Sequence, residues 1–73
     1  MNNGKTILLV DDDDALRESL RDQLQLHEDF TIREATNGAD AIKASKEANH
    51  DLLILDVGLP DMDGREVCRL MRR

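Results

Sequence analysis

Two short apolar runs, each ended abruptly by aspartate, constrain the fold of this chain more than any other feature. Residues 6–10, TILLV, lead straight into four consecutive aspartates, and residues 52–55, LLIL, end at Asp56. Neither run alternates between apolar and polar side chains. Each therefore predicts a strand that is covered on both faces, as in a parallel sheet.

A helix is predicted directly after the first aspartate cluster. Leucines recur every four residues from Leu16 to Leu24, which is the spacing of an apolar stripe on one helix face. Asp14 is the predicted N-cap, because its side chain can accept a hydrogen bond from the first turn. The charged residues between the leucines, Arg17 among them, are expected on a solvated outer face.

The middle of the chain predicts one more strand and one more helix. Residues 30–35 alternate between apolar and polar side chains, as expected of a strand near a sheet edge. Asn37 and Asp40 then provide capping groups for a helix over residues 39–48.

The last segment predicts a loop and a third helix. Residues 58–64 contain two glycines and a proline, which indicate a loop. Asp63 and Glu66 have the spacing of a capping box for a helix over residues 65–73. Turn and cap roles are assigned to Asp61 and Asp63.

The order strand–helix, repeated three times, predicts an α/β fold with a parallel sheet in a single domain, residues 1–73. Right-handed crossovers and the burial of the two apolar strands give the strand order 2-1-3. Ligand sites in such sheets form beyond the carboxyl ends of the strands, where strand order reverses. Asp11, Asp12 and Asp56 are expected to converge there, because adjacent strands lie about 4.8 Å apart.

The acidic cluster and the overall charge indicate which partners this chain takes. Three carboxylates in one cleft repel each other, and Mg²⁺, which prefers oxygen ligands, relieves that repulsion. The net charge of −6 argues against direct nucleic-acid binding. No apolar run approaches the ~20 residues of a membrane span, and no signal peptide is recognisable. The single cysteine, Cys68, fits a reducing, cytoplasmic location.

Three stretches of the chain resemble response-regulator receiver domains of two-component signalling. The stretches are ILLVDDDDALRESL, EATNGADAI and DLLILDVGLPDMDGREVCRLMR. The most specific motif is D-x-x-L-P-x-M-D-G. It begins at Asp56, directly after an apolar strand. The resemblance covers nearly all of the chain from Thr6 onward.

The resemblance implies a role for each residue of the cluster. Asp56 matches the nucleophile that takes a phosphoryl group from the phosphohistidine of a sensor histidine kinase or phosphotransfer protein. Asp12 would bind Mg²⁺ directly, Asp11 mainly through water, and Gly58 through its backbone carbonyl. Such a domain is a phosphoacceptor that catalyses its own phosphorylation and dephosphorylation when complete, and is not otherwise an enzyme.

The family fold is a flavodoxin-like unit of five strands in the order 2-1-3-4-5. Residues 1–73 match its first three strand–helix pairs, so the Ser or Thr of strand four and the Lys and aromatic residue of strand five are not in this sequence. We therefore expect phosphorylation of this chain alone to be impaired. We also expect a homodimer, formed by antiparallel pairing of the exposed third strand or by exchange of elements between protomers.

Two other functions are weighed against the receiver hypothesis. One is a self-associating half-domain without signalling chemistry. The other is a metal-dependent phosphatase or nuclease that uses the acidic cluster, which ranks last because no general base or phosphate-binding loop accompanies the carboxylates. Asp13 and Asp14 are assigned to solubility and helix capping.

Overall fold

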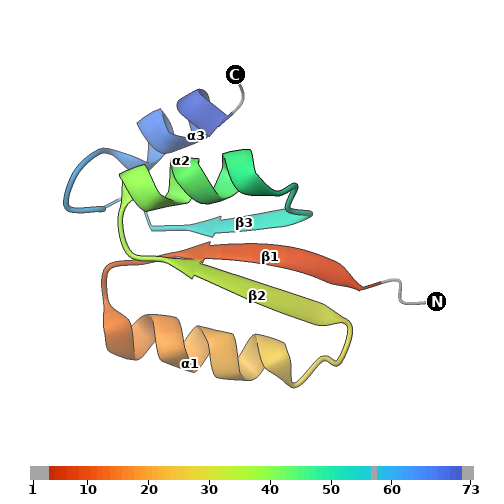
Figure 1. The fold of residues 1–73 in the computed structure, drawn as a ribbon. Helices are drawn as coiled ribbons and strands as arrows, with labels where there is room; N and C mark the ends of the chain where they lie inside the picture. Colours follow the sequence, from red (N-terminus) through yellow and green to blue (C-terminus); the bar gives the residue numbers. More distant parts are fainter. Residues whose placement is uncertain (1–3, 57, 72–73) are drawn as a thin grey trace.

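The computed structural model describes residues 4–56 and 58–71, which form three strands and three helices in strict alternation (Figure 1). In those two ranges no helix is long and apolar enough to cross a membrane. The elements are β1 (Lys5–Val10), α1 (Asp14–Gln25), β2 (Phe30–Ala35), α2 (Gly38–Glu47), β3 (Leu52–Leu55) and α3 (Gly64–Met71).

The three strands form a parallel sheet in the order β2-β1-β3, as predicted. The apolar run of β1 lies in the centre, and all four residues from Ile7 to Val10 are buried. The alternating strand β2 lies at one edge, as its polar side chains predict. The prediction that β3 is covered on both faces was wrong: none of its residues is buried, and Leu52 is 52% exposed, because α1 packs mainly on β2 and β1. The expected exposed edge is present, since β3 pairs only with β1 within the described residues.

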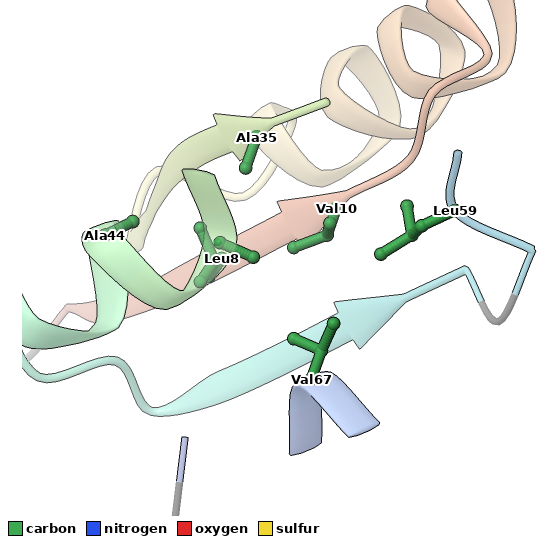
Figure 2. Close-up of a cluster of buried hydrophobic side chains, with 7 residues drawn as sticks. Leu8, Val10, Ala35, Ala44, Leu59 and Val67 are labelled. Atoms are coloured by element: carbon green, nitrogen blue, oxygen red, sulfur yellow. The ribbon is translucent and has the colours of Figure 1, made fainter. Parts of the chain in front are cut away.

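The helices cover both faces of the sheet, with α1 on one side and α2 and α3 on the other (Figure 1). Every second residue of β1 points to the same face. Leu8 and Val10 consequently join the core beneath α2 and α3, to which the loop after β3 contributes Leu59 (Figure 2). The other buried members of that core are Ala35, Ala41, Ala44 and Val67.

The helix starts differ in how well the sequence located them. The cap of the second was predicted correctly, because the Asn37 side chain accepts a hydrogen bond from the backbone N–H of Asp40 at 2.8 Å, although α2 spans Gly38–Glu47 and so lies one residue before the predicted 39–48. The first was misplaced by one residue. Asp13 is the N-cap, accepting from the N–H of Leu16 at 3.1 Å, and Asp14 is already helical. In a run of four aspartates every member has the same capping chemistry, so the sequence leaves the register open.

The capping box predicted for the third helix does not form. The Asp63 carboxylate accepts from the backbone N–H of Arg65, and the Asp63 carbonyl accepts from the N–H of Glu66. The Glu66 side chain pairs with Arg69 instead of reaching back to Asp63. The helix was expected to continue to residue 73, and its last two residues lie outside the described part of the chain.

Candidate functional site

The candidate site is built where β1 and β3 end together. Val10 pairs with Leu55, so the next residues, Asp11 and Asp56, leave the sheet side by side. The ladder of hydrogen bonds continues one residue beyond the strands: the N–H of Asp56 donates to the Val10 carbonyl at 2.9 Å, and that of Asp11 donates to the Ala35 carbonyl at 3.2 Å. The backbone positions of both aspartates are therefore set by the sheet itself.

The three predicted carboxylates do converge. One oxygen from each of Asp11, Asp12 and Asp56 can be chosen so that all three lie within 4.8 Å of one another. Asp11 is buried, Asp56 is half-buried and Asp12 is exposed, so the cluster opens to solvent on one side. The convergence predicted from the sequence is present, while the roles of the three residues stay predictions.

The oxygen donor set fits a small divalent cation. Opposite ligands of an octahedral Mg²⁺ lie about 4.2 Å apart, which is twice the usual Mg–O distance of about 2.1 Å. Only one pair among three ligands can be opposite, and adjacent ligands lie about 3.0 Å apart. The carboxylate oxygens of Asp11, Asp12 and Asp56, which lie within 4.8 Å of one another, must therefore move closer together to share one ion. Carboxylates are also the hard ligands that Mg²⁺ prefers, and the exposed side leaves room for the waters that it retains.

Asp11 and Asp56 make the same local hydrogen bond. Asp11 Oδ1 accepts from the N–H of Asp13 at 2.9 Å, and Asp56 Oδ1 accepts from the N–H of Gly58 at 3.0 Å. Each bond spans two residues and uses one lone pair of one oxygen, so each carboxylate keeps acceptor capacity for a ligand. These bonds also fix the first residues of the two loops relative to the carboxylates.

A half-buried arginine holds the loop between β1 and α1, which the sequence did not predict. The Arg17 side chain is only 12% exposed, and it donates to the Asp11 carbonyl at 2.9 Å, to Glu34 at 3.0 Å and to Asp14 at 2.7 Å. The hydrogen bond to Asp14 is the main reason that the pKa of Arg17 is raised. The expected solvated outer face was wrong for this residue, because its partner Glu34 comes from β2, 17 residues away.

The loop between β3 and α3 is held by a different contact. The Asp61 carboxylate accepts from the backbone N–H groups of Gly38 and Ala39, at 2.7 and 2.9 Å. These two bonds, the one from Gly38 first, lower the pKa of Asp61. Asp61 was expected to act as a turn or cap residue, and it caps α2, which lies far away in the sequence.

Gly58 lies at the start of this loop and is exposed. A Cβ atom at its position would approach the Asp56 carboxylate oxygens to 3.7 and 4.0 Å, which is ordinary van der Waals contact. Position 58 therefore has room for a side chain, and the metal-binding role of its backbone carbonyl stays a prediction.

Known proteins with the same sequence pattern were found by comparison. The family model for the response regulator receiver domain matches residues 7–73. The transcriptional regulatory protein ResD of Bacillus subtilis is 47% identical over 70 residues, covering 96% of this chain and 29% of its own length. GltR of Pseudomonas aeruginosa, also a transcriptional regulatory protein, is 47% identical over 70 residues, covering 96% of this chain and 28% of its own length. The chain thus spans less than a third of these relatives.

Solved structures agree with the fold. A CheY-like response regulator receiver domain from Methylobacillus flagellatus superposes with a TM-score of 0.89 at 26% identity, over 96% of this chain and 58% of that one. A crystal structure of the histidine kinase ThkA in complex with the response regulator TrrA matches with a TM-score of 0.84 at 43% identity. That match covers 93% of this chain and 58% of the other.

Proposed function

Since this chain belongs to the response regulator receiver domain family, we propose that it carries the phosphoacceptor half of a receiver site. In this proposal Asp56 takes a phosphoryl group from a histidine kinase or phosphotransfer protein, in a reaction that depends on Mg²⁺. Asp11, Asp12 and the Gly58 carbonyl complete the metal-binding set.

One observation carries this proposal: three carboxylates from two adjacent strand ends lie within 4.8 Å, with the candidate nucleophile among them. The backbone hydrogen bond from Asp56 to Val10 fixes the main chain at the nucleophile. A carboxylate in this position, half-buried and open on one side, is accessible to an incoming phosphoryl donor.

The chemistry assigned to Asp56 is in-line displacement at phosphorus. A carboxylate oxygen of Asp56 forms a bond to phosphorus as the bond between phosphorus and the donor imidazole nitrogen breaks. The electron pair leaves with that nitrogen, which takes a proton from solvent. A bound Mg²⁺ would neutralise the charge that develops on the phosphoryl oxygens. The same residues would support hydrolysis of the acyl phosphate, so the domain would act on itself and not on a separate substrate.

A histidine kinase or phosphotransfer protein is the partner proposed to supply the phosphoryl group. The match to TrrA, whose structure was solved in complex with the kinase ThkA, supports a partner of this class. The single cysteine remains the argument for a reducing, cytoplasmic location.

A 73-residue polypeptide of this sequence is also proposed to self-associate through β3. Leu52 exposes 52% of its surface, and within the described residues β3 pairs only with β1. An apolar strand edge of this kind favours pairing with another strand. Light scattering after gel filtration tests this: a dimer is expected, and a monodisperse folded monomer at micromolar concentration would contradict it.

The phosphoacceptor proposal is tested with a small-molecule phosphodonor and Mg²⁺, read by intact-protein mass spectrometry. A phosphoryl adduct is expected to form slowly on the wild type and not at all on Asp56→Asn. Asp22→Asn is the matched control, because it removes the same charge from a side chain that is 71% exposed on α1.

The outcomes separate the competing functions. An adduct on wild type and Asp22→Asn alone supports the proposal. An adduct that persists in Asp56→Asn contradicts it, and so does steady release of phosphate from an ester without any adduct. No adduct on any of the three proteins favours self-association without signalling chemistry.

A further inference from the structure

We propose that Asp61 is a positioning residue: together with Met62 it fastens the loop that carries Gly58 to the first turn of α2. This inference rests on the proposed function, because it gives the loop the task of presenting the Gly58 carbonyl to a metal held by Asp56. We term these contacts the latch: Asp61 and Met62 pack against Gly38 and Ala39.

The polar part of the latch is a divided helix cap. The first turn of a helix has N–H groups without partners inside the helix. In α2 the Asn37 side chain accepts from the N–H of Asp40, whereas Asp61 accepts from those of Gly38 and Ala39. Each oxygen of Asp61 takes one of the two N–H groups, so both are engaged at once.

The apolar part of the latch is a close approach that only glycine permits. A Cβ atom added to Gly38 would lie 2.4 Å from Cγ and 2.8 Å from Sδ of Met62, and 3.0 Å from a methyl carbon of Val67. Gly38 is buried beneath these side chains. Met62 therefore packs directly against the backbone of α2, next to the hydrogen bonds of Asp61.

The latch is linked to the site through a short stretch of chain. Leu59 is buried in the core at 8% exposure, three residues before Met62. Gly58 directly precedes Leu59, and its N–H donates to Asp56 Oδ1 at 3.0 Å. The loop is thus fixed at Leu59 and again at Asp61 and Met62. Loosening the second attachment frees the loop to shift, which moves the Gly58 carbonyl relative to Asp56.

The variant Asp61→Asn tests the latch with little change in shape. An asparagine side chain has one acceptor oxygen, so in the orientation of Asp61 it takes one of the two N–H groups and turns an NH₂ group toward the other. Asp40→Asn is the matched control. It removes the same charge beside the same turn of α2, but the side-chain hydrogen bond of Asp40 is with Asn37 and not with the described residues of the loop.

Two readouts separate positioning from general stability. The first is the affinity for Mg²⁺ of the folded protein, which we expect Asp61→Asn to weaken about three- to tenfold, near the low end for residues that orient metal ligands. The second is the amide NMR resonance of Gly58 without metal, which we expect to shift in Asp61→Asn and to stay in place in Asp40→Asn. Urea unfolding in EDTA measures stability separately.

Unchanged Mg²⁺ affinity and an unmoved Gly58 amide in Asp61→Asn overturn the latch, whatever happens to stability. Equal weakening by Asp61→Asn and Asp40→Asn also overturns it, since charge alone would then be the cause. If the wild type binds no Mg²⁺, the proposed function fails, and the Gly58 amide decides the latch by itself: a shift confined to Asp61→Asn supports it, and no shift overturns it.

Discussion

The two loops that border the site present their carboxylates in the same way but are fastened by opposite means. Asp11 and Asp56 each accept a hydrogen bond from the N–H two residues further on. The loop after β1 is then held by a cation, because Arg17 reaches back from α1 to the Asp11 carbonyl. The loop after β3 is held by an anion, because Asp61 reaches across to the first turn of α2.

The difference shows how far each loop depends on distant parts of the chain. Arg17 comes from the helix that follows its loop, six residues after Asp11. Asp61 and its partner Gly38 are 23 residues apart. The first loop is thus fastened mainly by its own strand–helix unit. The second is in place only when α2 has packed beside α3.

Breaking the first fastening is expected to have the largest effect. Arg17→Met keeps the apolar stem of the side chain but removes hydrogen bonds to Asp11, Glu34 and Asp14. Hydrogen bonds to charged groups contribute about 1.5–3 kcal/mol each when buried. We expect a loss of about 2–3 kcal/mol in the free energy of unfolding, measured by urea denaturation, because Asp14 is exposed and contributes little.

Arg65→Met is the control for Arg17→Met. Arg65 also pairs with an aspartate beside the site, Asp63, but its side chain is 87% exposed. Substitutions at exposed positions usually change stability by less than about 0.5 kcal/mol. Equal losses in the free energy of unfolding of the two variants would show that the low exposure of Arg17 adds nothing to stability. The loop after β1 would then have no special attachment.

Disrupting the attachment of the loop after β3 with a steric clash is expected to lower the free energy of unfolding by a smaller amount. In Gly38→Ala the new methyl group must displace Met62, with a penalty of about 1–2 kcal/mol for overpacking after any gain in helix propensity. Gly58→Ala is the matched control, because its Cβ has room and should change stability little. The double variant with Met62→Ala should recover part of the loss, and complete additivity would contradict the close approach.

The pH dependence gives the smallest effect and tests the anion directly. The folded-state pKa of Asp61 lies below its ordinary value of 3.8, so the unfolded state binds more protons in that range. The stability from Asp61 is therefore fully present above about pH 4–5 and is lost as pH falls through the lowered pKa.

Comparing the wild type with Asp61→Asn isolates the contribution of Asp61 to stability. The pKa of Asp63 is lowered by Arg65, but Asp63 titrates in both proteins and so does not affect the difference. Urea titrations from pH 6 to pH 3 should show the wild-type advantage constant at first and then shrinking. An advantage that grows toward pH 3 would mean that the carboxylate form of Asp61 does not hold the loop.

Contacts close in sequence were predictable, and contacts between units were not. The apolar runs and their terminal aspartates predicted the strand order and the convergence of Asp11, Asp12 and Asp56, because paired parallel strands end at one edge. The roles of Arg17 and Asp61 escaped prediction. Their side chains have the chemistry of an ordinary helix surface and an ordinary turn. Only the packing of α1 on β2 brings Glu34 to Arg17, and only the packing of α2 beside α3 brings Gly38 to Asp61.

The central claim is that Asp56 accepts a phosphoryl group at a site that needs a divalent cation. The most direct test measures the rate of adduct formation with a small-molecule phosphodonor as Mg²⁺ is varied, and locates the adduct by peptide mass spectrometry. We predict an adduct on Asp56 whose rate rises to saturation with Mg²⁺ and requires more Mg²⁺ in Asp12→Asn. Formation at the same rate in EDTA, or an adduct on another residue, would contradict the account.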